Sequence, residues 1–127
     1  MAMERGGKVV LVVEDDDGMR EAIESLLDAA GYETAAYASA EAMLDGGGAE
    51  GALCVISDLN LPEMSGMELL SKLQRRGGRP PVIVITGYDS AATRAEATRR
   101  GAAAYFAKPF LGTELIAAIE SISAQMR

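Results

Sequence analysis

Four apolar runs in this sequence each lead to a side chain that can bind a cation or a phosphoryl group. Glu14 and Asp15 follow the first run, Asp58 ends the second, Thr86 ends the third and Lys108 follows the fourth. In an open parallel sheet, ligands bind at the carboxyl ends of the strands, at the point where the strand order reverses. If the runs are strands of one such sheet, these carboxylates, the hydroxyl and the ammonium meet at one edge. That combination predicts a site for Mg²⁺ and a phosphoryl group.

Asp58 is the candidate nucleophile, because a carboxylate can take a phosphoryl group covalently and form an acyl phosphate. Considered alone, Asp58 would fit a turn or a helix cap equally well. Glu14 and Asp15 change that balance, since neighbouring carboxylates repel one another unless a cation lies among them. Mg²⁺ accepts oxygen ligands of this kind and commonly bridges carboxylates to a phosphate. Together the three residues predict a magnesium-dependent phosphoacceptor.

Other polar residues near the run ends have simpler explanations or supporting roles. Asp16 and Asp17 are better interpreted as capping residues of the first helix, where acidic side chains suit the positive end of the helix dipole. Thr86 alone would be an ordinary strand-end threonine. Lys108 can neutralise a carboxylate cluster and later pair with a phosphoryl oxygen. Its peptide bond to Pro109 can be cis, which would fix the direction of the loop.

The composition is that of one folded domain. The length of 127 residues suits a single core, and the hydrophobic content of 49% argues against disorder. Twelve basic and nineteen acidic residues give a net charge of −7, so no basic face for a nucleic-acid partner is visible. The absence of His and the single Cys argue against zinc chemistry. Cys54 itself is expected in the core.

The sequence shows no apolar run near the roughly 20 residues that span a bilayer, and no signal peptide. We therefore expect a soluble, cytoplasmic domain without a membrane partner. Residues 1–7 carry no periodicity and are expected to be a disordered leader, native or added for expression.

Short apolar runs alternate with helical patterns along the rest of the chain. Strands are expected at residues 9–13, 33–37, 53–57, 82–85 and 103–107, and helices at residues 19–30, 39–44, 65–73, 89–100 and 111–126. Five βα units with short connections predict an α/β fold with a doubly wound parallel sheet and helices on both faces. This pattern does not define the order of the strands.

Local signals mark several helix ends. Ser65 and Glu68 fit a capping box at the start of one helix. Asp89 is expected to cap the helix that runs to Arg100. Gly31 is a natural stop for the first helix.

Taken together, the motifs at the run ends resemble the response regulator receiver domain of two-component signalling. The matching strings are Val12-Val13-Glu14-Asp15-Asp16, Ser57-Asp58-Leu59-Asn60-Leu61-Pro62, Met64-Ser65-Gly66, Thr86-Gly87, Gly101-Ala102 and Lys108-Pro109-Phe110. The resemblance extends over residues 8–127, which would form the receiver (response regulatory) domain. It implies a flavodoxin-like (βα)5 fold whose five strands are ordered 2-1-3-4-5.

The resemblance implies a role for each acidic site residue. Asp58 would be the phosphoacceptor and Asp15 would bind Mg²⁺. Glu14 would support the metal directly or through water, and Asn60 would contribute its backbone carbonyl. Glu14 stands where the family most often has Asp, so its longer side chain could reach the metal differently.

The same resemblance implies how a signal would leave the site. Lys108 would pair with the phosphoryl group and Thr86 would hydrogen-bond it. Tyr105 matches the aromatic switch position, which turns inward in the family as the threonine moves. Its alternative is a half-buried strand tyrosine with its hydroxyl in water. Asn60 and Tyr88 occupy loop positions that tune the lifetime of the phosphoryl group in the family.

The resemblance therefore implies a phosphorylation switch of a phosphorelay, which assists its own phosphorylation and dephosphorylation but is not a conventional enzyme. A sensor histidine kinase or a phosphotransfer protein would donate the phosphoryl group. The response would appear at the fourth helix, fifth strand and fifth helix, roughly residues 90–126, through which two copies could also dimerise.

Two alternatives compete with this interpretation. Aspartate-nucleophile phosphatases also use Mg²⁺ at strand ends, but they usually need a second Asp two residues after the nucleophile, where this chain has Asn60. A receiver-like interaction module that is never phosphorylated would not need the acidic pair, Asp58, Thr86 and Lys108 together.

Overall fold

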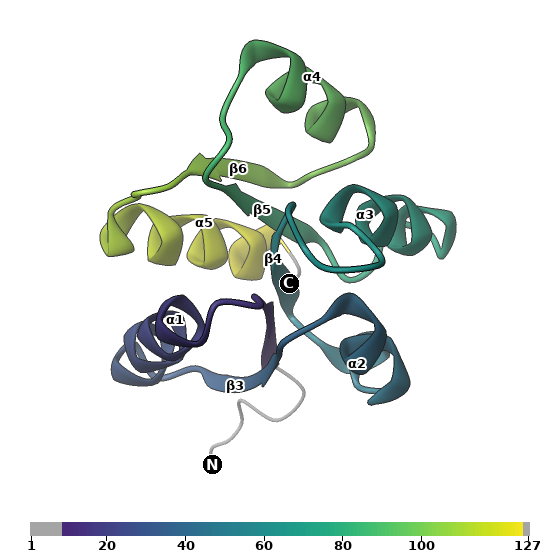
Figure 1. Cartoon of the computed structure of the whole chain (residues 1–127). Helices are drawn as coiled ribbons and strands as arrows, with labels where there is room; N and C mark the ends of the chain where they lie inside the picture. The colour runs from purple at the N-terminus through teal and green to yellow at the C-terminus, as the bar shows by residue number, and fades with distance from the viewer. Residues whose placement is uncertain (1–8, 126–127) are drawn as a thin grey trace.

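The computed structural model describes residues 9–125, so the leader expected at residues 1–7 lies outside the described residues. Strands and helices alternate along the chain, as the sequence predicts (Figure 1). In chain order the elements are β2 (Val9–Val13), α1 (Asp17–Ala29), β3 (Glu33–Tyr37), α2 (Ala40–Asp45), the 3₁₀ helix η1 (Ala49–Gly51), β4 (Cys54–Asp58), α3 (Gly66–Arg75), β5 (Val82–Thr86), α4 (Ala91–Arg99), β6 (Ala104–Ala107) and α5 (Gly112–Gln125).

The strands form one parallel five-stranded sheet in the order β3-β2-β4-β5-β6. Counted along the chain this is the order 2-1-3-4-5, so the fold prediction is confirmed. The chain leaves β2 toward one edge of the sheet and returns to place β4 on the other side of β2. Val13 pairs with Ser57 in this register. The carboxyl ends of β2 and β4 are therefore neighbours at the point where the strand order reverses.

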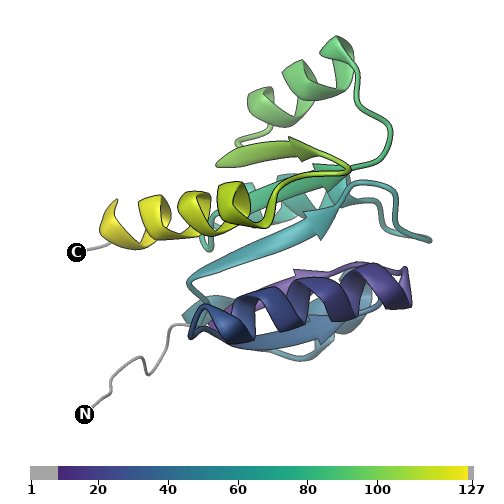
Figure 2. The same ribbon diagram turned by 90° about the vertical axis from the view of Figure 1, so that its left-hand side faces the viewer.

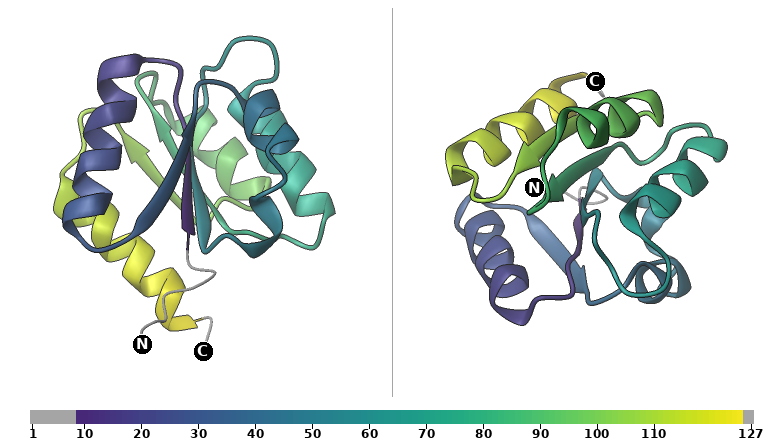
Figure 3. Two further views of the ribbon diagram at one scale, coloured as in Figure 1. Left: turned by 90° about the horizontal axis from the view of Figure 1, so that it is seen from below. Right: turned by 45° about the horizontal axis from the view of Figure 1, so that its top comes forward.

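Helices cover both faces of the sheet, with α1 and α5 on one face and α2, α3 and α4 on the other (Figure 3). Val10 and Val12 pack toward α1 and α5, whereas Leu11 and Val13 pack with residues of α2 and α3. Successive side chains of a strand point to opposite faces. Burial on both faces explains why β2 is apolar without interruption.

The strands all run in one direction, which Figure 2 shows from the side of α1 and α5. Their carboxyl ends therefore open toward the same edge of the sheet, as the location of the predicted site requires. Cys54, at the start of β4, is fully buried and unpaired. Burial raises the pKa of its thiol to about 12, which fits the expected core role.

The cap of α1 and the capping box of α3 form as predicted. Asp16 is the N-cap of α1, with its carboxylate accepting the Met19 N–H at 2.8 Å. In α3, the Ser65 hydroxyl accepts the Glu68 N–H, while the Glu68 carboxylate accepts the Ser65 N–H at 2.8 Å. Both caps span three residues, so the local sequence is enough to define them.

Two cap predictions need correction. Asp17 is not a cap: it is the first residue of α1, and its exposed carboxylate pairs with Arg20 at 2.6 Å. Asp89 does not cap α4 either. Ser90 is the N-cap, because its backbone is extended (φ −157°) and its hydroxyl accepts the Thr93 N–H at 3.0 Å. Asp89 lies one residue too early.

Helix α4 differs from the other helices in how little it buries. Its sequence consists of alanine and polar residues, and Ala97 is its only buried side chain. The helix has no apolar stripe, and polar contacts help to hold its carboxyl end against α3. The Arg100 guanidinium, just beyond the helix, donates to the Ser71 hydroxyl of α3 at 3.0 Å and to the Met67 carbonyl at 3.4 Å.

Candidate functional site

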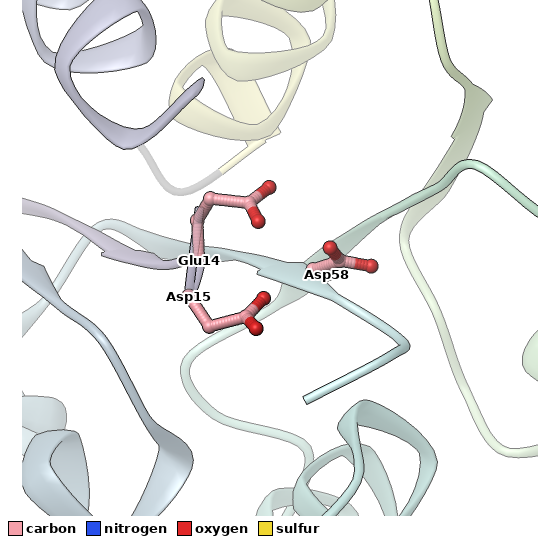
Figure 4. Close-up of side chains that lie close together, drawn as sticks. All are labelled: Glu14, Asp15 and Asp58. Carbon is pink, nitrogen blue, oxygen red and sulfur yellow. The ribbon is translucent and has the colours of Figure 1, made fainter. Parts of the chain in front are cut away.

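Three carboxylates meet at the reversal point of the sheet. Glu14 and Asp15 follow β2, and Asp58 ends β4. One carboxylate oxygen of each lies within 4.8 Å of those of the other two. Figure 4 shows the carboxylates of Glu14 and Asp15 turned to the side on which Asp58 lies. Their surroundings differ, since Glu14 is fully buried and Asp58 is 5% exposed, whereas Asp15 is exposed.

Lys108 joins two of these carboxylates. Its ammonium donates to Glu14 Oε1 at 2.9 Å and to Asp58 Oδ2 at 2.9 Å, across 94 and 50 residues of sequence. The Lys108 N–H donates to the Thr86 carbonyl at 2.8 Å, and the bond to Pro109 is cis, as the sequence allows. The lysine therefore holds an ammonium within hydrogen-bond distance of the candidate nucleophile before any phosphoryl group arrives.

Burial and pairing act against each other in this ion pair. Burial raises the pKa of Glu14, aided by the charge of Asp58, although hydrogen bonds from Lys108 and the Asp16 N–H lower it. For Lys108, burial lowers the pKa, but the hydrogen bonds and charges of Glu14 and Asp58 outweigh that effect and raise it overall. Burial is the largest single effect on both groups, but it sets the direction of the pKa shift only for Glu14, because Lys108 has two carboxylate partners whose combined effect exceeds it.

The second oxygen of Asp58 belongs to a chain of hydrogen bonds. Asp58 Oδ1 accepts the Asn60 N–H at 3.0 Å. The Asn60 side-chain oxygen accepts the Thr86 hydroxyl at 3.2 Å, and that hydroxyl accepts the Tyr88 N–H at 3.0 Å. Thr86 is buried at the end of β5. Its hydroxyl is therefore close to the site but directed at Asn60 in this state.

Tyr105 lies on the edge strand β6, and its hydroxyl has a protein partner. It donates to Asp89 Oδ1 at 2.9 Å, and the Arg94 guanidinium lies 4.4 Å from the ring centroid. Arg94 also pairs with Asp89 at 3.5 Å. Burial and the Asp89 carboxylate raise the pKa of the Tyr105 hydroxyl. Asp89, expected as a cap, thus takes part in a tyrosine contact that the sequence analysis missed.

The sequence analysis also missed two residues whose side chains hydrogen-bond the backbone around the site. The Arg20 guanidinium donates to the Glu14 carbonyl at 2.9 Å, and the Glu41 carboxylate accepts the Met64 N–H at 2.9 Å in the loop after β4. Arg20 lies one helical turn into α1, so its spacing from Glu14 was a usable signal. Nothing in the sequence links Glu41 to Met64.

The donor set fits a hard divalent cation. Lys108 supplies one positive charge against the carboxylates of Glu14, Asp15 and Asp58, so negative charge remains to be neutralised. Carboxylate oxygens and backbone carbonyls are the ligands that such cations prefer. The acidic cluster could therefore bind a metal, as the strand-end positions predicted.

A parallel sheet in this order, with carboxylates and a lysine at its reversal point, defines a doubly wound α/β domain of the flavodoxin-like class. The chain matches the family model described as the response regulator receiver domain over residues 10–120. It is 38% identical to the transcriptional regulatory protein FixJ of Azorhizobium caulinodans over 112 residues, 88% of this chain and 53% of that protein. It is 42% identical to the response regulator protein FleR of Pseudomonas aeruginosa over 107 residues, 84% of this chain and 23% of that protein.

Solved structures agree with these relatives. The crystal structure of FixJ-N superposes with a TM-score of 0.82 at 34% identity, covering 92% of this chain and 94% of that one. A CheY-like receiver domain protein of Methanospirillum hungatei JF-1 gives a TM-score of 0.82 at 32% identity, covering 94% and 96%.

The chain belongs to the response regulator receiver domain family. It is a phosphoacceptor domain of two-component signalling, and neither the phosphatase nor the unphosphorylated module is favoured by its relatives. The chain spans about half the length of the FixJ relatives that it matches. Within residues 9–125, no helix combines the length and apolarity needed to cross a membrane.

Proposed function

We propose that Asp58 accepts the phosphoryl group and that Mg²⁺ binds beside it. Asp15 and Asp58 would be the carboxylate ligands of the metal. Glu14 would contact the metal directly or through water, and the Asn60 backbone carbonyl would complete the ligand set. The observation that carries this assignment is the position of Asp58, which touches Lys108 while its carboxylate lies near those of Glu14 and Asp15. Residues 8–127 would form the receiver domain.

The proposed transfer forms one bond to phosphorus and breaks another. A carboxylate oxygen of Asp58 attacks the phosphorus of a phosphohistidine, the P–N bond breaks, and the electron pair leaves with the partner's imidazole. The product is an acyl phosphate on Asp58. When bound, Mg²⁺ supplies positive charge to the transferring oxygens. The ammonium of Lys108 exchanges its contact with Asp58 Oδ2 for one with a phosphoryl oxygen.

A sensor histidine kinase or a phosphotransfer protein is the proposed donor. An apolar groove beside Lys108 suits a helix of that donor, because any donor must bring its phosphohistidine to Asp58. The groove lies between α1 and the start of α5, and Leu111 next to it is 63% exposed. Its lining residues are Met19, Ala22, Ile23, Leu26, Pro109, Phe110 and Gly112.

The metal assignment predicts unequal effects for two neighbouring aspartates. Asp15→Asn should weaken Mg²⁺ binding by about tenfold or more, since it removes a proposed ligand. Asp17→Asn should change the affinity little, because Asp17 faces solvent and pairs with Arg20. Amide chemical shifts followed during a Mg²⁺ titration measure both affinities.

Asp15→Asn should also raise the melting temperature of the metal-free protein, because it relieves repulsion among the carboxylates. Equal losses of Mg²⁺ affinity in Asp15→Asn and Asp17→Asn would show that the ligands are misassigned.

The proposed switch runs through Thr86 and Tyr105. A phosphoryl group on Asp58 offers the Thr86 hydroxyl a charged acceptor in place of Asn60. A bound group can shift a conformational equilibrium only through such differential contacts. Movement of Thr86 would then let Tyr105 leave Asp89 and turn inward. We place the response at α4, β6 and α5, while the homodimer expected through this surface stays a prediction.

Thr86→Ala should reduce the response without preventing modification. When beryllofluoride is added with Mg²⁺, wild-type amide shifts should change across residues 90–125, and these changes should be smaller in Thr86→Ala. Thr34→Ala, on the far edge strand β3, is the control and should respond as the wild type does. A full response in Thr86→Ala would exclude this threonine from the switch.

A further inference from the structure

The loop between β4 and α3, residues 59–65, is held at both ends by hydrogen bonds to the end of β4, at Asp58 and at Leu59. The Asn60 N–H donates to Asp58 Oδ1 at 3.0 Å, and the Gly66 N–H donates to the Leu59 carbonyl at 3.0 Å. Gly66 lies so close to the strand end that a Cβ added there would clash with the Asp58 carbonyl oxygen. Small shifts of this loop therefore change the surroundings of Asp58 directly.

The middle of the loop is held by a side chain from another helix. Glu63 has a φ of 61°, in the left-handed region that costs energy for a residue with a Cβ. The next residue, Met64, donates its N–H to Glu41 Oε2 at 2.9 Å. Glu41 lies in the first turn of α2, 23 residues earlier in the sequence. The Glu41 carboxylate thus meets the loop just after its strained residue.

The other oxygen of Glu41 makes this contact costly for folding. Glu41 Oε1 is buried and has no hydrogen-bond partner in the described part of the chain. Burying a carboxylate oxygen without a donor is unfavourable for folding. Rules of packing and polar satisfaction are typically broken at functional sites. The loop that Glu41 holds carries Asn60, whose backbone carbonyl is a proposed metal ligand.

We propose that Glu41 is a positioning residue of the phosphoacceptor site. Its carboxylate fixes the Met64 amide and thereby sets where residues 59–65 present the Asn60 carbonyl beside Asp58. Glu41 itself touches neither the metal nor the phosphoryl group. The inference rests on the proposed function, because it assumes that Mg²⁺ binds at this loop. Residues that orient ligands in this way commonly affect metal affinity as strongly as some ligands do.

Two substitutions separate the hydrogen bond from the bulk of the side chain. Glu41→Met keeps a side chain of similar length and removes the acceptor, whereas Glu41→Gln keeps an oxygen that can accept the Met64 N–H. Asp45→Ala, which removes an exposed carboxylate at the end of the same helix, is the control. Thermal unfolding of each variant verifies that it is folded.

Three measurements follow on each protein. Hydrogen exchange of the Met64 amide in the metal-free protein reports the contact itself. A Mg²⁺ titration followed by amide shifts gives the affinity, and the rate of labelling by acetyl phosphate gives the reactivity. We expect Glu41→Met to lose protection at Met64 and to bind Mg²⁺ about tenfold more weakly. Glu41→Gln should restore both, and Asp45→Ala should match the wild type.

The outcomes distinguish this inference from the proposed function. A wild-type protein that binds Mg²⁺ and is labelled, beside a Glu41→Met variant of unchanged affinity, overturns the positioning role alone. Equal impairment of Glu41→Gln and Glu41→Met also overturns it, because the hydrogen bond would then not be what matters. A wild-type protein that neither binds Mg²⁺ nor is labelled overturns the proposed function, and the positioning role with it.

Discussion

In the presence of Mg²⁺ and acetyl phosphate, we expect the wild-type chain to gain one phosphoryl group and Asp58→Asn to gain none. Three features of the structure favour the carboxylate of Asp58 as the nucleophile. It ends a strand at the reversal point of the sheet, it contacts the ammonium of Lys108, and it lies beside Glu14 and Asp15. An amide in its place cannot form an acyl phosphate. Intact-mass measurement of both proteins checks the result.

Two controls make this experiment specific. Asp17→Asn removes an exposed carboxylate a few residues from the site and should be labelled like the wild type. Chelation of Mg²⁺ should abolish labelling of the wild type. Labelling of Asp58→Asn at the wild-type level would refute the assignment of the phosphoacceptor.

Lys108→Met should lower the free energy of unfolding by about 3 kcal/mol at neutral pH, the cost typical of removing one partner from a buried ion pair. Lys108 contacts both Glu14 and Asp58, which are almost completely buried. Without the ammonium, these two carboxylates would face each other uncompensated. Urea unfolding followed by circular dichroism measures the loss, and Lys72→Met on α3 is the matched control with little expected effect.

The loss in Lys108→Met should depend on pH with a definite sign. Burial already raises the pKa of Glu14 in the folded protein, and removal of the lysine raises it further. A raised acid pKa favours the folded state fully below the unfolded value of 4.5, and this contribution disappears as the pH rises through the folded value. The free energy of unfolding of the variant should therefore be closest to that of the wild type below pH 4.5, and the difference should be largest near neutral pH.

The contribution of Lys108 itself follows the same rule at higher pH. Its raised pKa gives stability that is present below its usual value of 10.5 and is lost only above it. The titration of Lys108 therefore does not affect a comparison of unfolding free energies between acid and neutral pH. An equal loss of stability at both pH values would mean that Lys108 contributes through packing and not through its charge.

The sequence predicted the parts of the site that depend on strand ends and on local spacing. The five site residues lie at the ends of strands or directly after them, so their convergence requires only the sheet order: Glu14, Asp15, Asp58, Thr86 and Lys108. The Asp16 cap and the Ser65 capping box need no more than three residues of sequence. These features were predictable because each is determined by one element or by the topology.

Other features depend on tertiary placement, which local patterns do not contain. Residues 14–17 form a single acidic run, yet Glu14 is buried while the three aspartates are exposed. Asp89 and Ser90 are both good capping residues, and only the backbone of Ser90 decides between them. The contact of Tyr105 with Asp89 depends on the path of a loop. The sequence predicted that Lys108 neutralises the carboxylate cluster, but only the structure identifies Glu14 and Asp58 as the two carboxylates that it contacts.

The sparse packing of α4 affects how stability is distributed over the domain. Local opening of a segment costs little free energy when the segment buries few apolar side chains. Because α4 buries only Ala97, it should open and close as a unit of low local stability while β2, β4 and β5 remain protected. A rearrangement of α4 would then use only a small part of the global free energy of folding. The helix that is least anchored in the core is thus the one that can respond to chemistry at Asp58 without endangering the sheet that holds it.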